Sequence, residues 1–447
     1  MAFVRCKTFV TESFNELLKP SSREVPMIDG LRGMSILLIV LFHSFYGVLF
    51  VLRRFEPILN FLNSIPTPLT FVTGSDKAVD IFFVISAFLL GSSIFQKIES
   101  GINFNRAEIT KFYIKRLFRI YPLFLIGIIL YFPINAKQSF RNLPYNLVFL
   151  DNFDFKCIIP VGWSLSIEMQ FYFILPWLAK FIYRFKENKR ILILSTLCLS
   201  SVLIAAFVCI IYPEIYQTHF YNFHPDHINP TTMMDRLYYP THTRFGPLIL
   251  GLIWAYIHVH GKLHEAVDNF FSQHSSFQYG FIFGGLILMY LMMFFPVYPP
   301  QSLYYQHFSP TLNLFLHASH RVIFCIGLLM VVFPVFFSSI HVTPLTKSIK
   351  RLLSLSIFRP YSQVVFPIYL FHFPMIALAG LAIFQTTKIQ TIQTLTIYDV
   401  FKIFTLASVL SLLLGIVLHT LIEKPLIKKG YRWVDHSHFL KGQNSRI

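Results

Sequence analysis

Ten apolar stretches, each close to the length of a membrane-spanning helix, constrain this sequence more than any other feature. A bilayer core of about 30 Å requires roughly 20 mostly apolar residues per helix. The stretches are continuous and lack period-2 alternation, which excludes a transmembrane β-barrel and predicts an all-α, polytopic helical membrane bundle. The composition agrees, because 13% of the residues are charged where a soluble domain has about 25%. We place the predicted spans at residues 33–52, 78–96, 118–134, 161–179, 191–212, 242–258, 277–297, 321–341, 364–386 and 401–422.

The charged residues are unevenly distributed, with 38 Lys and Arg against 21 Asp and Glu and a formal net charge of +17. Segments on the side of both termini hold about 27 basic residues, and the opposite loops hold about 8. Because basic loops are retained in the cytosol, both termini are expected to be cytosolic. This topology accounts for most of the positive charge, so no nucleic-acid partner is required. The predicted division is a cytosolic segment at 1–32, a transmembrane domain at 33–422 and a cytosolic tail at 423–447.

The five cysteines form an odd number and include no Cys-x-x-Cys pair. A disulfide framework or a thiolate zinc site is therefore not expected, and nothing in the sequence requires a metal. The first 32 residues contain no apolar run of signal-peptide length, so no cleaved signal is expected.

The first predicted span carries two ionisable residues on one helix face. Arg32 and His43 are 11 residues apart, or about three turns, so both point the same way with about 16 Å between them along the axis. Arg32 then lies at the cytosolic edge, where it can bind phosphate, and His43 lies near the midplane, where it can transfer a proton. The alternative is that Arg32 is a topological anchor and that His43 bonds the backbone of a neighbouring helix.

A basic cluster enters the third span from the same side of the bilayer. Arg116 and Arg119, at i and i+3, share a helix face, and Lys111 and Lys115 add charge nearby. Arginine forks match the geometry of phosphate, which predicts an anionic cytosolic ligand. Attraction to anionic lipid headgroups is the alternative, and it suits the lysines better.

The fourth span contains a carboxylate. Glu168 lies about 10 Å below the predicted external surface, and Ser164 is one turn above it on the same face. A carboxylate at that depth must pair with a cation, take up a proton or line a water-filled space. We expect it to orient His43 or to bind a sugar hydroxyl, and a purely structural pair with His or Arg is the alternative.

Other polar residues within the spans add to this pattern. Tyr369 and His372, at i and i+3 in the ninth span, place a second histidine near the midplane. Arg244 opens the sixth span from the external side, where a topology signal is not expected, which favours a ligand or a carboxylate partner. Asp80 and Ser86 of the second span are expected to be a helix-end group and a helix-packing hydroxyl. Histidines and a carboxylate within the bilayer suit acid–base chemistry better than ion conduction.

These residues belong to an ordered series of motifs that resembles the acyltransferase-3 family of integral membrane acyltransferases. The resemblance extends from about residue 26 to about residue 426. The Ser-Gly-Phe motif usual in the family reads Ser86-Ala87-Phe88 here, which adds a methyl group at a helix contact and leaves the chemical groups intact. The series comprises Arg-x10-His (Arg32, His43), Phe-Phe-Val-Ile-Ser-Ala-Phe (82–88), Arg-x-x-Arg-Ile-x-Pro (Arg116, Arg119, Ile120, Pro122), Trp-Ser-Leu-x-x-Glu (Trp163, Ser164, Leu165, Glu168), Tyr-Leu-x-His (Tyr369, Leu370, His372) and Glu-Lys-Pro (Glu423, Lys424, Pro425).

The resemblance implies transfer of an acyl group, commonly acetyl, from cytosolic acyl-CoA to a hydroxyl of an extracytoplasmic carbohydrate such as a surface polysaccharide or lipopolysaccharide O-antigen. Acetyl-CoA is then the co-substrate, and membrane lipid and the glycan acceptor are the partners. The implied location is the bacterial cytoplasmic (inner) membrane.

Under this hypothesis Arg32, Arg116 and Arg119 hold the phosphates of acyl-CoA. His43 acts either as the general base on the acceptor hydroxyl or as a transient carrier of the acyl group, and Glu168 orients His43 or the acceptor. The expected substrate-binding residues are Trp163, Ser164, Arg244, Tyr369 and His372.

A proton-coupled transporter or exporter of a glycan or lipid intermediate is the alternative from another class, with the histidines and Glu168 as a proton relay. No inverted repeat is visible in the sequence, which disfavours many transporter folds. A non-catalytic membrane scaffold would leave the ionisable groups within the spans unexplained.

Overall fold

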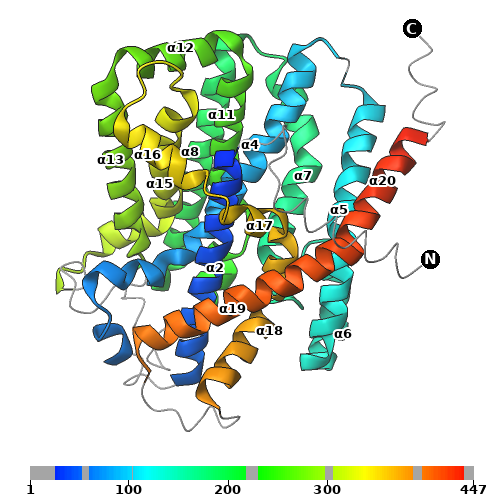
Figure 1. Cartoon of the computed structure of the whole chain (residues 1–447), viewed down its shortest axis with the longest axis vertical. Coiled ribbons are helices and arrows are strands. Elements are labelled where there is room, and N and C mark those ends of the chain that lie inside the picture. The colour runs from blue at the N-terminus through cyan, green and yellow to red at the C-terminus, as the bar shows by residue number, and fades with distance from the viewer. Residues whose placement is uncertain are drawn as a thin grey trace.

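The computed structural model describes residues 26–52, 60–102, 104–217, 230–296, 306–385 and 395–436 (Figure 1). Within these ranges the chain is helical and forms no β-strand, as the apolar stretches predict. The longer helices are α2 (Pro26–Leu52), α4 (Ala78–Glu99), α5 (Arg106–Tyr131), α6 (Ala136–Leu147), α7 (Gly162–Ile182), α8 (Glu187–Ile211), α11 (Gly246–Val259), α12 (Gly261–Gln273), α13 (Ser275–Met293), α15 (Pro310–Phe337), α16 (Pro344–Leu353), α18 (Val365–Phe384), α19 (Ile397–Leu418) and α20 (Lys424–His436). Shorter elements are η1 (Thr67–Lys77), η2 (Phe132–Asn135), η3 (Pro213–Ile215), α9 (Pro230–Met233), η4 (Met234–Tyr238), α10 (Thr241–Arg244), α17 (Phe358–Gln363) and η6 (His419–Glu423).

Eight helical segments of the described chain are long and apolar enough to cross a membrane. They coincide with eight of the ten predicted spans. At the two remaining positions the structure has α7, which has 21 residues and contains the polar Trp-Ser-Leu-x-x-Glu sequence, and α11, which has 14 residues. Many large apolar side chains on the outer helices are exposed, for example Phe207 of α8 (62%) and Ile129 of α5 (72%). Such a surface suits contact with lipid, and the chain is an integral multi-pass membrane protein.

The third predicted span differs from the helix that forms there. Helix α5 begins at Arg106, twelve residues before the predicted start at 118, because the Asn105 side chain caps it by accepting a hydrogen bond from the Glu108 amide (3.1 Å). Its first turns carry the basic cluster, which the hydropathy pattern does not register as a span. Helix α5 ends at Tyr131, close to the predicted end at 134, and the chain continues into η2 and α6.

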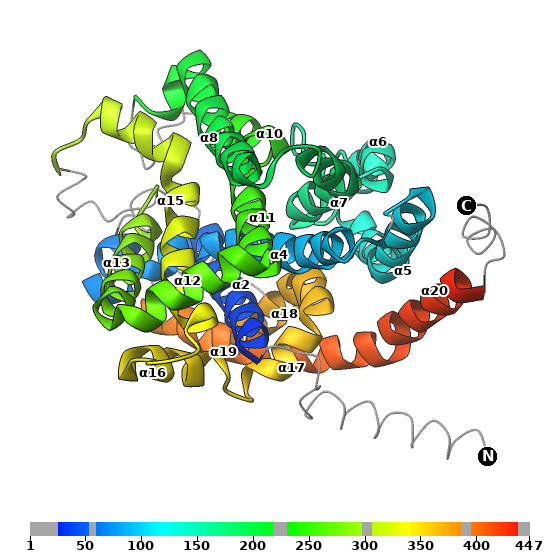
Figure 2. The same ribbon diagram turned by 90° about the horizontal axis from the view of Figure 1, so that it is seen from above.

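Helix α4 is the central element of the bundle. Its segment is the most buried of the eight candidate spans, and it contacts α2, α7, α11 and α15. Seen from above, it lies between α5 and α7 on one side and α2 and α13 on the other (Figure 2). The groups that α4 carries are therefore available to several surrounding helices at once.

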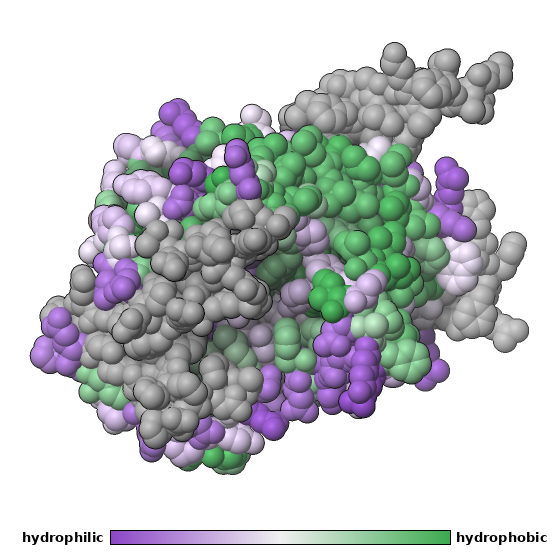
Figure 3. Space-filling model, turned by 90° about the horizontal axis from the view of Figure 1, so that it is seen from below, coloured by the Kyte–Doolittle hydropathy of each residue, from purple (hydrophilic) through white to green (hydrophobic). Residues whose placement is uncertain are grey.

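The two ends of the bundle differ in structure (Figure 1). One end carries α12 and the N-terminal end of α2, and the opposite end carries α6. Seen from the α6 end, the surface is hollowed near its middle, beside a broad apolar area (Figure 3). Helix α20 follows the π-helical turn η6 and packs against α5 beside the bundle.

Candidate active site

A cavity of about 240 Å³ lies between α2, α4, α5, α7 and α18. Its walls are mainly apolar, but each of the five helices contributes at least one polar group. The polar group from α18 is a single tyrosine hydroxyl. Six of the ten predicted site residues line it. The polar lining residues are Arg32, Ser86, Ser93, Arg116, Arg119, Ser164, Glu168, Tyr172 and Tyr369.

Three arginines face this cavity. Arg116 and Arg119 come from one face of α5, as their spacing predicts, and Arg32 comes from the first turns of α2. None of the three forms an ion pair with any residue that the structure describes, and Nε of Arg116 is buried without a hydrogen-bond partner there. The Arg116 guanidinium lies 5.7 Å from the Phe112 ring centre and 6.0 Å from that of Tyr172, so aromatic faces hold it in place.

Glu168 is the acidic group of the cavity wall. Ser86 and Tyr172 lie beside its carboxylate, and their hydroxyls hydrogen-bond to each other at 2.8 Å. Arg32 and Arg119 are close enough to interact with Glu168 electrostatically. With three arginines and one carboxylate, the described lining favours an anionic ligand.

Ser164 and Tyr369 close the cavity at its deep end. Their hydroxyls are hydrogen-bonded across the gap between α7 and α18. Along α18 the lining residues are Val365, Phe366 and Tyr369, and His372 follows one turn further on.

His43 and His372 contact each other beyond this closure and are not part of the cavity wall. Nδ1 of His43 lies 2.9 Å from Nε2 of His372, and the ring centres are 4.8 Å apart. His372 is fully buried, whereas His43 is partly accessible. Glu168 was expected to orient His43 or to bind a sugar hydroxyl, and the described residue hydrogen-bonded to His43 is His372.

Arg244 and Trp163, two predicted substrate-binding residues, also lie outside the cavity wall. Arg244 is 2% exposed and pairs with Asp80 at 2.9 Å. Its guanidinium packs between the rings of Trp163 (5.1 Å) and Tyr238 (4.8 Å). Of the two partners that its external position favoured, a ligand or a carboxylate, the structure provides the carboxylate.

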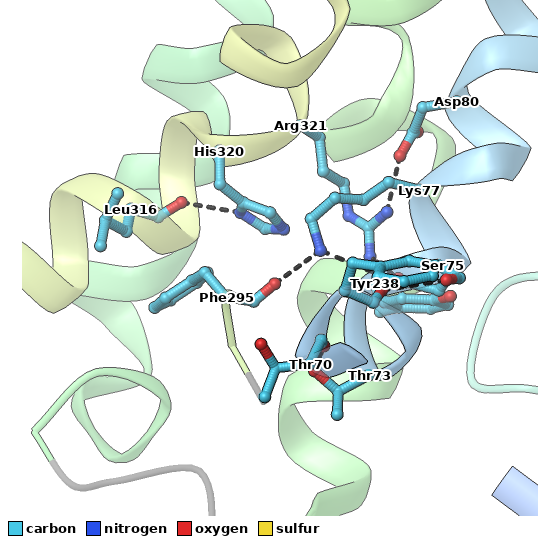
Figure 4. A network of polar contacts seen from close by, with 12 residues as sticks. Thr70, Thr73, Ser75, Lys77, Asp80, Tyr238, Phe295, Leu316, His320 and Arg321 are labelled. Atoms are coloured by element: carbon cyan, nitrogen blue, oxygen red, sulfur yellow. Dashed lines mark hydrogen bonds and ion pairs between the residues drawn. The ribbon is translucent and has the colours of Figure 1, made fainter. Parts of the chain in front are cut away.

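Arg244 is part of a buried ion cluster, which consists of Asp76, Lys77, Asp80, Arg244 and Arg321. Arg321 of α15 bridges Asp76 (2.5 Å) and Asp80 (2.6 Å), and Lys77 contacts Asp76 (3.4 Å). Figure 4 shows Lys77 directed at the Phe295 carbonyl, 2.5 Å away, and Arg321 extending toward Asp80. The cluster joins η1 and α4 to α10 and α15.

Several of these residues carry little signal of their role in the sequence. Arg321 opens the predicted span 321–341, where a basic residue is ordinary, and Asp76 and Lys77 lie in the predicted loop just before the span 78–96. Tyr172 carries no signal of its own, because a tyrosine in an apolar helix is common. Arg321 could have been recognised because a charged residue inside a membrane span is costly and therefore requires a partner.

The segment before α7 is anchored to that helix by Asp151. The Asp151 carboxylate is fully buried and accepts a hydrogen bond from the Ser166 hydroxyl. Burial raises the pKa of Asp151 above its usual range. Its second oxygen has no hydrogen-bond partner within the described ranges. This contact positions the first turns of α7, which carry Trp163 and Ser164.

Comparison with known proteins places this arrangement in a family. The chain is 23% identical over 269 residues to the peptidoglycan O-acetyltransferase OatA of Listeria monocytogenes, a match that covers 56% of this chain and 36% of that protein. It is 28% identical over 268 residues to the O-acetyltransferase OatA of Staphylococcus aureus, covering 55% and 37%. It is also 27% identical over 203 residues to an uncharacterised protein of Haemophilus influenzae, covering 40% and 74%.

The match therefore spans about a third of the length of the two OatA proteins. No solved structure matches the chain. The profile of the acyltransferase-3 family, described as an acyltransferase domain, matches residues 25–420, which include every helix that lines the cavity. The chain belongs to the acyltransferase-3 family.

Proposed function

We propose that this protein transfers an acyl group, most simply acetyl, from cytosolic acyl-CoA to a hydroxyl of an extracytoplasmic carbohydrate. The observation that carries the proposal is the convergence of Arg32, Arg116 and Arg119 on one cavity without ion-pair partners among the described residues. Family membership and the O-acetyltransferases among the relatives support acyl transfer. The setting is the bacterial cytoplasmic membrane.

The charge of the arginines and the volume of the cavity support acyl-CoA as the donor. The three arginines are partly buried and form no ion pair with a described residue, so an anionic ligand completes the arginine cluster. Acyl-CoA carries phosphates at one end and a thioester on a long, narrow arm at the other. A cavity of about 240 Å³ is too small for the whole molecule. In our proposal the phosphates stay at the arginines and the arm extends along the cavity toward Ser164 and Tyr369.

In our proposal the chemistry takes place where Ser164 and Tyr369 separate the cavity from His43, and this hydrogen-bonded contact opens so that the thioester reaches the imidazole. The acceptor oxygen forms a bond to the thioester carbonyl carbon, and the carbon–sulfur bond breaks. His43 removes the proton of the acceptor hydroxyl and returns it to the departing CoA thiolate, so the products are an ester and free CoA. The alternative order, in which His43 first takes the acyl group and then passes it to the acceptor, balances equally. Glu168 sits between the arginines and the deep end, where it can hold a polar group of the donor arm.

The acceptor is expected to enter from the α6 end of the bundle, where the surface is hollowed (Figure 3). Peptidoglycan is the polymer that the name of the Listeria relative gives. Surface glycans share the hydroxyl that the reaction needs, and we propose this broader class of acceptor.

The test uses the full-length protein in nanodiscs, acetyl-CoA labelled with ¹³C in the acetyl group, and a glycan fraction from cells that lack the gene. Mass spectrometry should find the label as an ester on the glycan. Absence of glycan ester with folded protein would overturn the proposal. A parallel assay uses the protein reconstituted in sealed vesicles. If the glycan crosses the vesicle membrane unlabelled, the protein is a transporter.

The donor site is tested separately with two matched variants. Replacing both Arg116 and Arg119 by Gln should raise the KM for acetyl-CoA by about tenfold or more, while the KM for the glycan stays within about twofold. The double Lys variant keeps the charge but loses the forked donors, so it should fall between the Gln variant and the wild type. A Gln variant that impairs only acceptor use would place the donor elsewhere.

A further inference from the structure

The hydrogen-bond partners of His372 determine which of its nitrogens carries a hydrogen atom. Its Nδ1 lies 2.8 Å from the Tyr369 carbonyl oxygen and 3.2 Å from that of Ile368. A carbonyl oxygen only accepts hydrogen bonds, so Nδ1 of His372 must carry hydrogen. In a neutral imidazole the other nitrogen, Nε2, then presents a lone pair.

A neutral state is favoured for this ring by its surroundings. His372 is fully buried, and its ring packs on Phe373 and on His43. Among the residues described, no carboxylate forms a hydrogen bond or an ion pair with His372 or His43. Asp76 interacts with His43 only at longer range. A buried imidazolium without such a partner is costly.

The neighbouring histidine must match this pattern. The contact of 2.9 Å between Nε2 of His372 and Nδ1 of His43 needs one hydrogen, and His372 has none to offer there. The hydrogen therefore resides on Nδ1 of His43.

We propose that His372 is a positioning residue that holds His43 as its Nδ1–H tautomer and thereby leaves the Nε2 lone pair of His43 free to react. This inference rests on the proposed function and assigns the reacting atom within it. Nε2 of His43 makes no hydrogen bond to any described residue, and the His43 side chain is partly accessible. Without His372 the ring can flip or adopt the other tautomer, which places hydrogen on the nitrogen that must take the proton.

The contact between the two histidines also stabilises the imidazolium form of His43 that exists during the reaction. When Nε2 of His43 takes the acceptor proton, Nδ1–H of the resulting imidazolium still donates to Nε2 of His372. The stabilisation comes from a neutral hydrogen-bond acceptor and not from a carboxylate. Return of the proton to the CoA thiolate restores the neutral pair, so the two histidines end the cycle as they began.

The experiment compares two substitutions of His372 in the full-length protein. His372→Leu removes the acceptor, whereas His372→Gln retains an oxygen that can accept from His43. We expect H372L to lower kcat by about 100-fold or more with the KM for acetyl-CoA nearly unchanged, and H372Q to restore most of that loss. The control is His274→Gln. His274 makes the same type of contact from Nδ1 to a backbone carbonyl (3.1 Å) but is exposed and distant in the fold, so H274Q should retain full activity.

The double variant H43A/H372L separates positioning from a role in folding. If His372 acts through His43, the double variant should be no less active than H43A alone, and all variants should unfold at a similar temperature. Additive losses, or an H372Q variant as inactive as H372L, would overturn the inference. If the wild type itself transfers no label, the proposed function fails; if the wild type is active and H372L is equally active, only this inference fails.

Discussion

The Arg244 guanidinium lies 2.9 Å from the Asp80 carboxylate, and both side chains are buried in the interior of the bundle. Arg321 contacts the other oxygen of the same carboxylate at 2.6 Å. Asp80 therefore sits between two buried cations. Asp80 thus joins Arg244 to Arg321 within the buried ion cluster.

We expect Asp80→Asn to destabilise the protein by about 3–5 kcal/mol, because two buried arginines lose their shared anion while the shape of the side chain is kept. The measurement is thermal unfolding in detergent. Asp154→Asn is the matched control. The Asp154 side chain is 54% exposed and pairs with Arg236 at 3.3 Å, so its loss should cost at most about 1 kcal/mol. Equal losses of stability in the two variants would show that the buried ion cluster does not stabilise the protein more than an exposed ion pair does.

A second prediction concerns the contact between α4 and α11. A Cβ atom on Gly251 would lie 2.2 Å from the Val84 carbonyl oxygen and 2.8 Å from the Cβ of Ala87. Gly251→Ala should therefore separate the two helices and cost about 1–3 kcal/mol or more, with a lower yield of folded protein. The control is Gly280→Ala in α13, where no neighbouring atom lies within 4 Å. That change should be neutral or stabilise the helix by up to about 1 kcal/mol.

A third prediction addresses the closure formed by Ser164 and Tyr369. Tyr369→Phe removes the hydrogen bond across the deep end of the cavity and keeps the ring. If this contact keeps water from the thioester, Y369F should release CoA from acetyl-CoA faster than the wild type in the absence of glycan, by about two- to tenfold.

Tyr131→Phe is the control for this experiment. The Tyr131 hydroxyl donates to the Leu370 carbonyl of α18 at 3.2 Å, but Tyr131 does not line the cavity. Y131F should leave the background release of CoA unchanged. An increase in both variants would indicate a general loosening of α18 and not a local opening.

A fourth prediction concerns pH. Burial raises the pKa of Asp151, so the folded protein binds more protons than the unfolded chain from about pH 4 up to the raised pKa. This contribution makes the wild type less stable as the pH rises through that window. Asp151→Asn cannot lose a proton, so its stability relative to the wild type should increase with pH, by about 1.4 kcal/mol for each unit of pKa shift.

Asp268 provides a control of opposite sign. Burial tends to raise its pKa, but hydrogen bonds from the Ser339 hydroxyl (2.6 Å) and amide (2.9 Å) outweigh burial and lower it. The stabilisation from Asp268 is present above its ordinary pKa and is lost as the pH falls through the lowered one. Asp268→Asn should therefore weaken the protein at neutral pH and have no effect in acid. Thermal unfolding from about pH 2 to about pH 8 measures both variants. Parallel curves for D151N and wild type would contradict the Asp151 prediction.

The helices could be predicted from the sequence because a backbone that crosses a membrane must satisfy its own hydrogen bonds, which an α-helix does. Helix α8, for example, was placed at 191–212 and spans Glu187–Ile211. The gathering of Arg32, Arg116 and Arg119 around one cavity was also expected from their helix faces and depths. Glu168 was expected beside His43 or the acceptor, and the structure places it in the wall of the arginine cavity. The start of α5 was not, because its first turns are basic and a polar cap, not hydropathy, sets its beginning.

The sequence by itself determined an all-helical membrane bundle, because no water is available in the bilayer to satisfy an open backbone and each span must satisfy its own hydrogen bonds. It also identified many of the ionisable residues that enter that bundle, but not Asp76, Lys77 and Arg321. Only the tertiary structure decided their partners. Arg244 meets Asp80 across 164 positions of the chain, and His43 meets His372 across 329. Such contacts depend on how helices pack against one another, and side-chain shape along whole helix faces governs that packing more than any local pattern of residues.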